Sequence, residues 1–321
     1  MSHIPQSGGP ESGGSPSGGP PFGHPRAYRA HAAFLAPARA RAEWWRTGLG
    51  IALTLVAGIA LYQLALAFLA SLAGPETMRA LFDETTFYGD TPRATLLTLF
   101  SYAFFATGLA MALNALHGRG LGSLIGPWEA ALSDFLRTVL AAGAILLGVT
   151  LLLPQGYDLV RNPQMATGLW LALLPLSLVA IAVQAGTEEM FFRGYLQQQI
   201  GARMPGWPAW MAVPATLFGL AHWAPDAAGG NAVWFLLWAT AFGFAAADLT
   251  ARTGTLGAAL GLHFANNAVA ILGTSLAGPG SGLALWHIPM RPDAPALAGL
   301  IPVEIATLFV AWLAARLALK V

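Results

Sequence analysis

The sequence predicts an all-α fold, a polytopic transmembrane helical bundle with about eight membrane-spanning segments. Of its 321 residues, 56% are hydrophobic and only 10% are charged, whereas soluble domains carry about 25% charged residues. The hydrophobic residues also form uninterrupted runs of about 20, the length that a helix needs to cross about 30 Å of hydrocarbon. Strand patterns that alternate over about ten residues are missing, which favours helices over a barrel.

Each hydrophobic run is an expected span. The runs cover residues 45–72, 94–116, 135–153, 169–186, 207–222, 232–249, 256–271 and 297–317. The fourth run continues as a helix to Ile200, because no helix breaker precedes Gly201 and Pro205. The fifth run is short and bounded by prolines, which favours a tilted or partial crossing.

The chain divides into a tail and one membrane domain. Residues 1–25 are mostly Gly, Ser and Pro, which bury too little surface to offset the entropy of ordering. We therefore expect a disordered tail over residues 1–40 and a transmembrane domain over residues 41–321. If the N-terminus is cytoplasmic, eight crossings return the C-terminus to the same side, and most arginines then lie inside, as the positive-inside rule requires. This predicts a multi-pass protein of the cytoplasmic membrane with both termini in the cytoplasm.

Composition also narrows the functions that the chain can have. The net charge is +1, and no basic patch interleaved with aromatic residues indicates nucleic-acid binding. The chain contains no cysteine, so disulfides, thiolate metal ligands and a cysteine nucleophile are excluded. Chemistry is left to Ser, Thr, Asp, Glu, His and Lys.

The first candidate site residues close the fourth run. Each ionisable residue inside a hydrophobic run costs about 2.5–3.5 kcal/mol to insert, so it is a functional candidate. Glu188 and Glu189 are neighbours on a helix and point about 100° apart, so they can take separate roles. Arg193 follows Glu189 by four residues, a favourable spacing for an ion pair. Glu188 is then free to face a cavity and act as a general base on water.

Two histidines and an asparagine complete the candidate set. His263 and Asn267 are four residues apart on one helical face, and their donors suit a developing oxyanion. His222 ends the fifth run and can hold the attacking water together with Glu188. Glu188, His222 and His263 are also a sufficient ligand set for catalytic zinc, with water in the fourth position. A metal-free mechanism and one with a divalent metal such as zinc both stay open.

Three motifs in order resemble the CPBP family of intramembrane proteases. They are EExxxR (Glu188, Glu189, Arg193), FxxxH (Phe218, His222) and HxxxN (His263, Asn267). The family includes type II CAAX prenyl endopeptidases and bacterial immunity and lysostaphin-resistance relatives, and the similarity covers residues 187–267. The resemblance implies a glutamate-dependent endopeptidase, in which Glu188 and His222 activate water while His263 and Asn267 stabilise the tetrahedral intermediate. It leaves metal dependence open and does not carry over specificity for prenylated substrates.

The resulting functional hypothesis is an intramembrane endopeptidase that hydrolyses a peptide bond of a membrane-associated protein or peptide. Its expected partners are membrane lipid and that substrate. The alternative is a non-catalytic membrane protein, either an immunity-type scaffold or a proton-coupled transporter. The catalytic hypothesis requires Glu188 and His222 to lie at similar depth, which hydropathy does not show.

Other protease classes find little support in the sequence. The HExxH zinc motif is absent, and Ser281 lies in a Gly-rich run typical of a flexible loop. Asp248 and Arg252 are four residues apart at a helix end, so we expect them to form an ion pair. Glu304, in the last run, has no assigned role.

Overall fold

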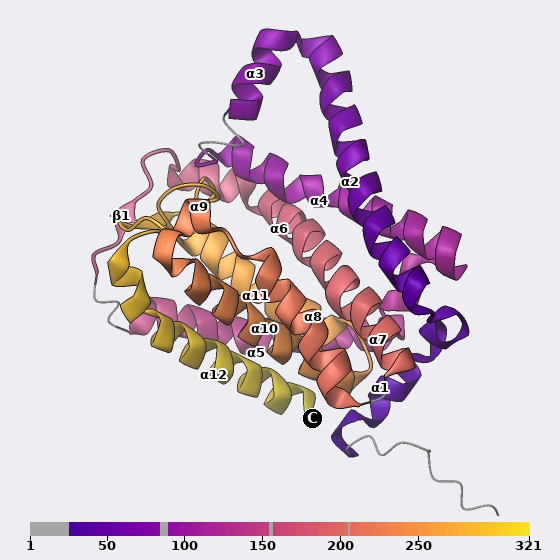
Figure 1. Cartoon of the computed structure of the whole chain (residues 1–321). Coiled ribbons are helices and arrows are strands. Elements are labelled where there is room, and N and C mark those ends of the chain that lie inside the picture. The colour runs from indigo at the N-terminus through magenta and orange to yellow at the C-terminus, as the bar shows by residue number, and fades with distance from the viewer. Residues whose placement is uncertain (1–25, 84–88, 154–156, 205) are drawn as a thin grey trace, which may run out of the picture.

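The computed structural model describes residues 26–83, 89–153, 157–204 and 206–321, and they form a helical bundle (Figure 1). The α-helices are α1 (Arg29–Phe34), α2 (Trp44–Ala73), α3 (Pro75–Asp83), α4 (Pro92–Ala112), α5 (Trp128–Leu152), α6 (Thr167–Glu189), α7 (Gln197–Arg203), α8 (Trp207–Ala221), α9 (Pro225–Ala228), α10 (Ala232–Thr253), α11 (Gly257–Ala268) and α12 (Ile301–Leu319). Short 3₁₀ segments are η1 (Arg26–Tyr28), η2 (Ala36–Arg41), η5 (Leu121–Leu124), η7 (Gly229–Asn231) and η9 (Pro295–Gly299). Three π-helical turns, η4 (Leu113–His117), η6 (Met190–Leu196) and η8 (Val269–Gly273), continue α4, α6 and α11.

Every expected span corresponds to a helix, so the all-α prediction is confirmed, but eight full crossings are not. Among the described residues, six helices are long and apolar enough to cross a membrane. The fifth and seventh expected spans are shorter: α8 has 15 residues, and the helix over Gly257–Gly273 is also below the length of a full span. Since a helix rises 1.5 Å per residue, α8 covers only about 22 Å of a hydrocarbon layer about 30 Å thick.

The fourth expected span is the longest continuous helix in the site region. It runs from Thr167 to Arg203 through α6, η6 and α7, which confirms that the helix passes the glutamate pair without a break. The change to π-helical bonding at η6 begins directly after Glu189. Single π-helical turns inside α-helices are frequent at functional sites.

Residues 26–40 differ from the expected disordered tail. They form η1, α1 and most of η2, and the side chains of His31, Phe34, Leu35 and Ala38 are buried. The Gly, Ser and Pro composition ends at residue 25, and the following stretch carries apolar residues that pack against the bundle. Residues 1–25 lie outside the described residues.

The N-terminal segment is tied to the helices near the C-terminus. The Tyr28 hydroxyl donates to Asp248 Oδ1 at 2.7 Å, and the Trp312 indole donates to Asp248 Oδ2 at 3.0 Å. Arg252 binds both carboxylate oxygens at 2.8 Å, so the expected Asp248–Arg252 pair is confirmed. The start of the described chain and the end of α12 therefore lie at the same end of the bundle (Figure 1).

A small sheet at the opposite end of the bundle was not expected. Its strands are β1 (Val160–Arg161), β2 (Thr274–Leu276) and β3 (Trp286–Ile288), in the order β1-β3-β2. β3 pairs antiparallel with β1 and parallel with β2. Strands this short give no hydrophobic periodicity from which they could be predicted.

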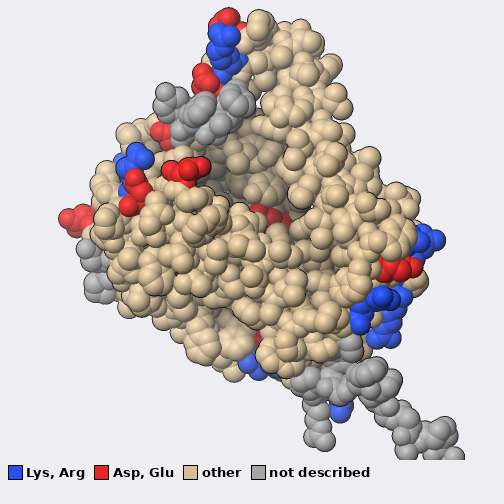
Figure 2. Space-filling model, viewed as in Figure 1, with Lys and Arg blue, Asp and Glu red and all other residues tan. Residues whose placement is uncertain are grey.

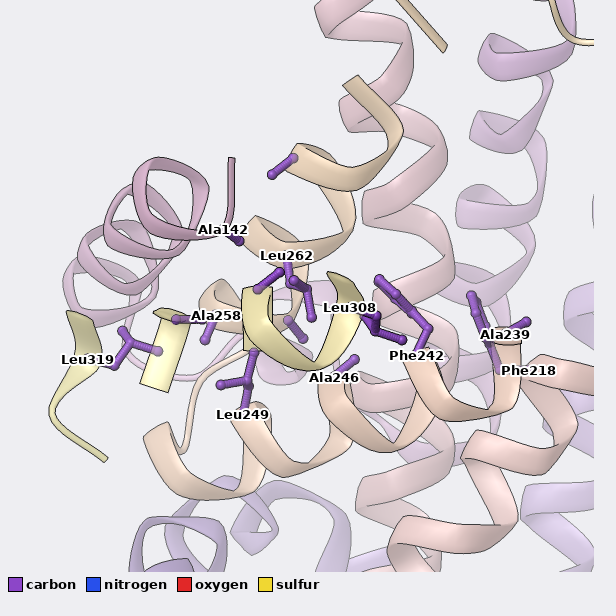
Figure 3. Packing of buried hydrophobic residues seen from close by; sticks show 14 residues of the cluster. Ala142, Phe218, Ala239, Phe242, Ala246, Leu249, Ala258, Leu262, Leu308 and Leu319 are labelled. Atoms are coloured by element: carbon purple, nitrogen blue, oxygen red, sulfur yellow. The ribbon is translucent and has the colours of Figure 1, made fainter. Parts of the chain in front are cut away.

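The main hydrophobic core lies among α5, α8, α10, α11 and α12. Side chains of these helices point toward one another, with Phe218, Phe242, Leu262 and Leu308 between several alanines (Figure 3). Small residues let helix backbones approach closely, which is typical of packing inside membranes. Helix α11, which carries His263 and Asn267, packs into this core.

Apolar atoms cover most of the face seen in Figure 2, and charged groups gather mainly at its two ends. The face is hollowed between the arm made by α2 and α3 and the remaining helices, and acidic atoms lie at the bottom of the hollow (Figure 2). A carboxylate in such surroundings is costly unless it has partners or a function.

Candidate active site

The three motif segments come together in the structure. Glu188 and Glu189 end α6, Arg193 lies in η6, and His263 lies in the middle of α11. His263 contacts both carboxylates, with Nδ1 2.8 Å from Glu189 Oε1 and Nε2 3.6 Å from Glu188 Oε2. Side chains more than 70 residues apart in sequence thus share one buried cluster.

Glu189 and Arg193 form the predicted ion pair. Arg193 Nη1 donates to Glu189 Oε1 at 2.8 Å, and both side chains are 0% exposed. The Arg193 guanidinium also lies 4.4 Å from the centre of the Phe218 ring. Removing two charges from water is costly, and the short contact and the additional bond from His263 offset only part of that cost. Arg193 Nε and Nη2 and Glu189 Oε2 are buried without a hydrogen-bond partner among the described residues.

Glu188 has a separate environment, as the spacing of the glutamates predicts. Its side chain is 13% exposed, and Oε2 has no hydrogen-bond partner among the described residues. Arg193 bonds to Glu189, and no arginine or lysine of the described residues forms an ion pair with Glu188. The Tyr102 side chain of α4 lies close to Glu188, a proximity that the motifs do not indicate.

The orientation of the His263 ring follows from its bond to Glu189. An ionised carboxylate only accepts hydrogen bonds, so Nδ1 carries the proton in this contact. Nε2 is thereby directed at Glu188. The same ring makes T-shaped contacts with Phe218 and Phe242, with centroid distances of 5.9 and 5.1 Å. The imidazole therefore lies between the two glutamates and these two aromatic rings.

His222 lies near this cluster without bonding to it. Its Nδ1 is 2.8 Å from the Phe218 carbonyl oxygen, and its ring lies 4.6 Å from the Phe218 ring. Phe218 therefore touches both imidazoles. Within the described part of the chain, no hydrogen bond or ion pair links His222 to Glu188. With Nδ1 donating to the carbonyl, Nε2 of His222 is the nitrogen left for other contacts.

The short length of α8 explains how His222 reaches the level of Glu188. The helix through Arg203 and α8 form an antiparallel hairpin, and Arg193 stacks on Phe218 where the two pack side by side. Moving away from the turn, Glu188 lies just over one helical turn beyond Arg193, and His222 lies one turn beyond Phe218. This arrangement is consistent with a similar depth for Glu188 and His222, which stays a prediction.

Asn267 lies one turn after His263 but has different partners. Its Nδ2 donates to Gln184 Oε1 at 2.8 Å, and its Oδ1 accepts from Asn266 Nδ2 at 3.2 Å. Gln184 lies on α6, one turn before Glu188, and none of the three motifs contains it. A buried glutamine inside a hydrophobic run is a signal that would have found it.

The positions of Glu188, His222 and His263 do not fit the zinc site that their residue types allow. Among the described residues, no group of three or more His, Cys, Asp or Glu side chains is placed to hold a metal ion. Glu188 and His263 approach each other, but His222 is turned to the Phe218 carbonyl. In the cluster, two carboxylates contact one imidazole. A zinc site of the expected kind would need two imidazoles and one carboxylate directed at the same metal position.

Comparison with known proteins agrees with this geometry. Residues 169–269 match the family described as type II CAAX prenyl endopeptidase Rce1-like. The chain is also 29% identical over 172 residues to the uncharacterized protein YyaK of Bacillus subtilis (strain 168), covering 52% of this chain and 56% of that protein. The similarity thus spans little more than half the length of this curated relative. No solved structure matches the chain significantly.

All of the motif residues, from Glu188 to Asn267, lie inside the matched segment. At the level of the family, the match implies an intramembrane protease with CAAX protease-like character. Residues 169–269, which build the cluster of carboxylates and imidazole, are thus the part of the chain that is similar to the Rce1-like family.

Proposed function

We propose that this chain is an intramembrane endopeptidase in which Glu188 activates water to hydrolyse a peptide bond of a membrane-associated protein or peptide. The observation that carries the proposal is the position of His263 between Glu189 and Glu188, at 2.8 and 3.6 Å, in a bundle of apolar helices. The cluster leaves Glu188 Oε2 without a hydrogen-bond partner among the described residues, and a carboxylate of this kind suits a general base.

The proposed reaction starts with water bound beside Glu188. The water oxygen forms a bond to the carbonyl carbon of the substrate, and its proton passes to Glu188. The carbonyl oxygen becomes an oxyanion that accepts hydrogen bonds from His263 and Asn267. The C–N bond then breaks, and Glu188 returns the proton to the leaving nitrogen. The products are a free carboxyl group and a free amine.

The supporting residues keep the reacting groups in place. Arg193 pairs with Glu189, and Glu189 fixes the His263 ring through Nδ1. Donation to the oxyanion uses Nε2 of His263, so the proposed mechanism uses the imidazolium form, in which both nitrogens are donors. His222, at the end of α8, is proposed to lie at a similar depth and to help hold the attacking water through Nε2.

No step of this mechanism uses a metal ion, because the three expected ligands do not converge. The same preparation tests the point directly: metal analysis and a chelator titration accompany the cleavage assay. The proposed setting is the cytoplasmic membrane, with lipid and the substrate protein or peptide as the partners.

The test is a cleavage assay with the full chain in liposomes. The probes are an internally quenched peptide ending in a farnesylated Cys–aliphatic–aliphatic–X sequence and the same peptide without the farnesyl group. We expect Glu188→Gln to lower kcat by about 10²–10⁴-fold, the usual contribution of a general base, and His263→Ala to abolish most cleavage. Comparison of the two probes shows whether an isoprenoid is needed.

Glu129→Gln is the matched control, because Glu129 is an exposed glutamate in the first turn of α5, outside the cluster. It should cleave at the wild-type rate. A folded wild-type protein that cleaves neither probe, or a Glu188→Gln variant that cleaves normally, would refute the proposal in favour of an immunity-type scaffold or a proton-coupled transporter.

A further inference from the structure

Gln184 stands out as a buried polar residue beside the proposed site. It lies on α6 one helical turn before Glu188, so the two side chains share one face of the helix. Its side chain is almost completely buried, at 8% exposure. A buried amide of this kind is costly in an apolar bundle unless its polar atoms have partners.

The partner of Gln184 is Asn267 on α11. Asn267 Nδ2 donates to Gln184 Oε1 at 2.8 Å, and Asn267 Oδ1 accepts from Asn266 Nδ2 at 3.2 Å. Both ends of the Asn267 amide are therefore engaged, which fixes the plane of the group. The amide nitrogen carries two hydrogens, and the bond to Gln184 uses one of them.

We propose that Gln184 is a positioning residue, which orients the Asn267 amide so that its second N–H can donate to the oxyanion of the substrate. The inference rests on the proposed endopeptidase function and adds a residue that none of the three motifs contains. The amide oxygen of Gln184 accepts the first N–H of Asn267 and so directs the nitrogen toward α6, the helix that carries Glu188.

The contact also links the two helices that carry the reacting groups. α6 bears Glu188 and Glu189, and α11 bears His263 and Asn267. The His263–Glu189 bond joins these helices at one level, and the Asn267–Gln184 bond joins them about one turn away. Two contacts at different levels restrict rotation of α11 relative to α6, which keeps the donors of His263 and Asn267 aligned.

The experiment compares Gln184→Leu with wild type in the liposome assay, using the two quenched peptides. Loss of an aligned oxyanion donor lowers kcat. We expect a decrease of about 10- to 100-fold, which is no larger than the decrease in kcat caused by deleting such a donor. KM should stay within about twofold, because the ground state does not use the oxyanion donor. A purely structural role would instead reduce the amount of folded enzyme and leave kcat per active site unchanged.

A double-mutant cycle isolates the path through Asn267. In an Asn267→Ala background, Gln184→Leu should have no further effect on kcat, because the group that it positions is already missing. Gln199→Leu is the matched control: Gln199 is fully buried on the same continuous helix and bonds to His117 at 3.2 Å, away from the site. We expect it to lower thermal stability but to leave kcat unchanged.

The outcomes separate the two proposals. If wild type cleaves and Gln184→Leu has an unchanged kcat, the positioning role alone is overturned. An additive effect of Gln184→Leu on kcat in the Asn267→Ala background overturns it as well. Absence of cleavage by wild type overturns the endopeptidase function itself. The same cycle measured on thermal unfolding needs no activity, and a lack of coupling there would show that the two side chains do not interact.

Discussion

His263 is the residue on which the candidate site is centred. It joins helix α11 to the two glutamates of α6, and its ring is oriented by Glu189 rather than by Asn267. The bond between Glu189 and Arg193 is local, since one helical turn separates them. The bond between Glu189 and His263 is not local, and it decides which ring nitrogen faces Glu188.

Replacement of Glu189 tests this arrangement at the scale of single residues. Glu189→Gln leaves the Arg193 charge buried without its partner, so we expect the free energy of unfolding to fall by about 3–5 kcal/mol. Cleavage should fall as well, because His263 loses the carboxylate that orients it. Unfolding in a denaturing detergent and the liposome assay measure the two effects.

A double variant separates stability from catalysis. Glu189→Gln combined with Arg193→Met removes the unpaired charge, so most of the lost stability should return. Activity should stay low, because the orientation of His263 is not restored. Full activity in the double variant would mean that Glu189 serves only to neutralise Arg193.

Helix α11 shows how an element of the fold places the site. A Cβ atom added at Gly257 would lie 1.9 Å from the Ala131 carbonyl oxygen, and one at Gly261 would lie 2.7 Å from the Phe135 carbonyl oxygen. Two glycines four residues apart thus let α11 approach α5 closely, as in the small-xxx-small motif of membrane helices. His263 follows Gly261 by two residues, about 200° around the helix, so it faces away from α5 and toward the glutamates of α6.

A substitution at this helix contact should therefore reach the site. Gly257→Ala forces α11 away from α5, and we expect a loss of stability of about 1–3 kcal/mol from overpacking, together with reduced cleavage. Gly148→Ala is the matched control, because Gly148 lies inside α5 with no atom within 4 Å of an added Cβ. There the change should be neutral or stabilise by about 0.5–1 kcal/mol. Equal behaviour of the two variants in unfolding experiments would argue against the close contact.

In the molecule as a whole, the start of the described chain and the end of α12 lie together. Tyr28 and Trp312 share Asp248 as a partner, whereas α3 lies at the far end of α2 (Figure 1). Residues that flank α2 and α12 on the shared side include Arg41, Arg46 and Arg316. By the positive-inside rule this side is proposed to face the cytoplasm.

Cysteine labelling can test this orientation, because the chain contains no native cysteine. Arg39, Arg79 and Val321 are exposed, and single variants Arg39→Cys, Arg79→Cys and Val321→Cys place one thiol at each point. In intact spheroplasts a membrane-impermeant maleimide should label Arg79→Cys alone. The other two should react only after permeabilisation. Labelling of Arg39→Cys and Val321→Cys from opposite sides would contradict a shared side for the termini.

The sequence by itself determined the properties that depend on composition and on neighbours along the chain. Long apolar runs predict membrane helices because hydrocarbon cannot hydrogen-bond the backbone. Spacing by one helical turn predicts the Glu189–Arg193 and Asp248–Arg252 pairs, and the motifs identify His263 and Glu188. These features need no knowledge of how the helices pack.

Only the tertiary structure decided how the segments meet. It packed residues 26–41 against the bundle and assigned His263 to the glutamates and Asn267 to Gln184. Each of these outcomes depends on contacts between segments far apart in sequence. Hydrophobic periodicity shows which face of a helix is buried, but it does not show which partner covers that face.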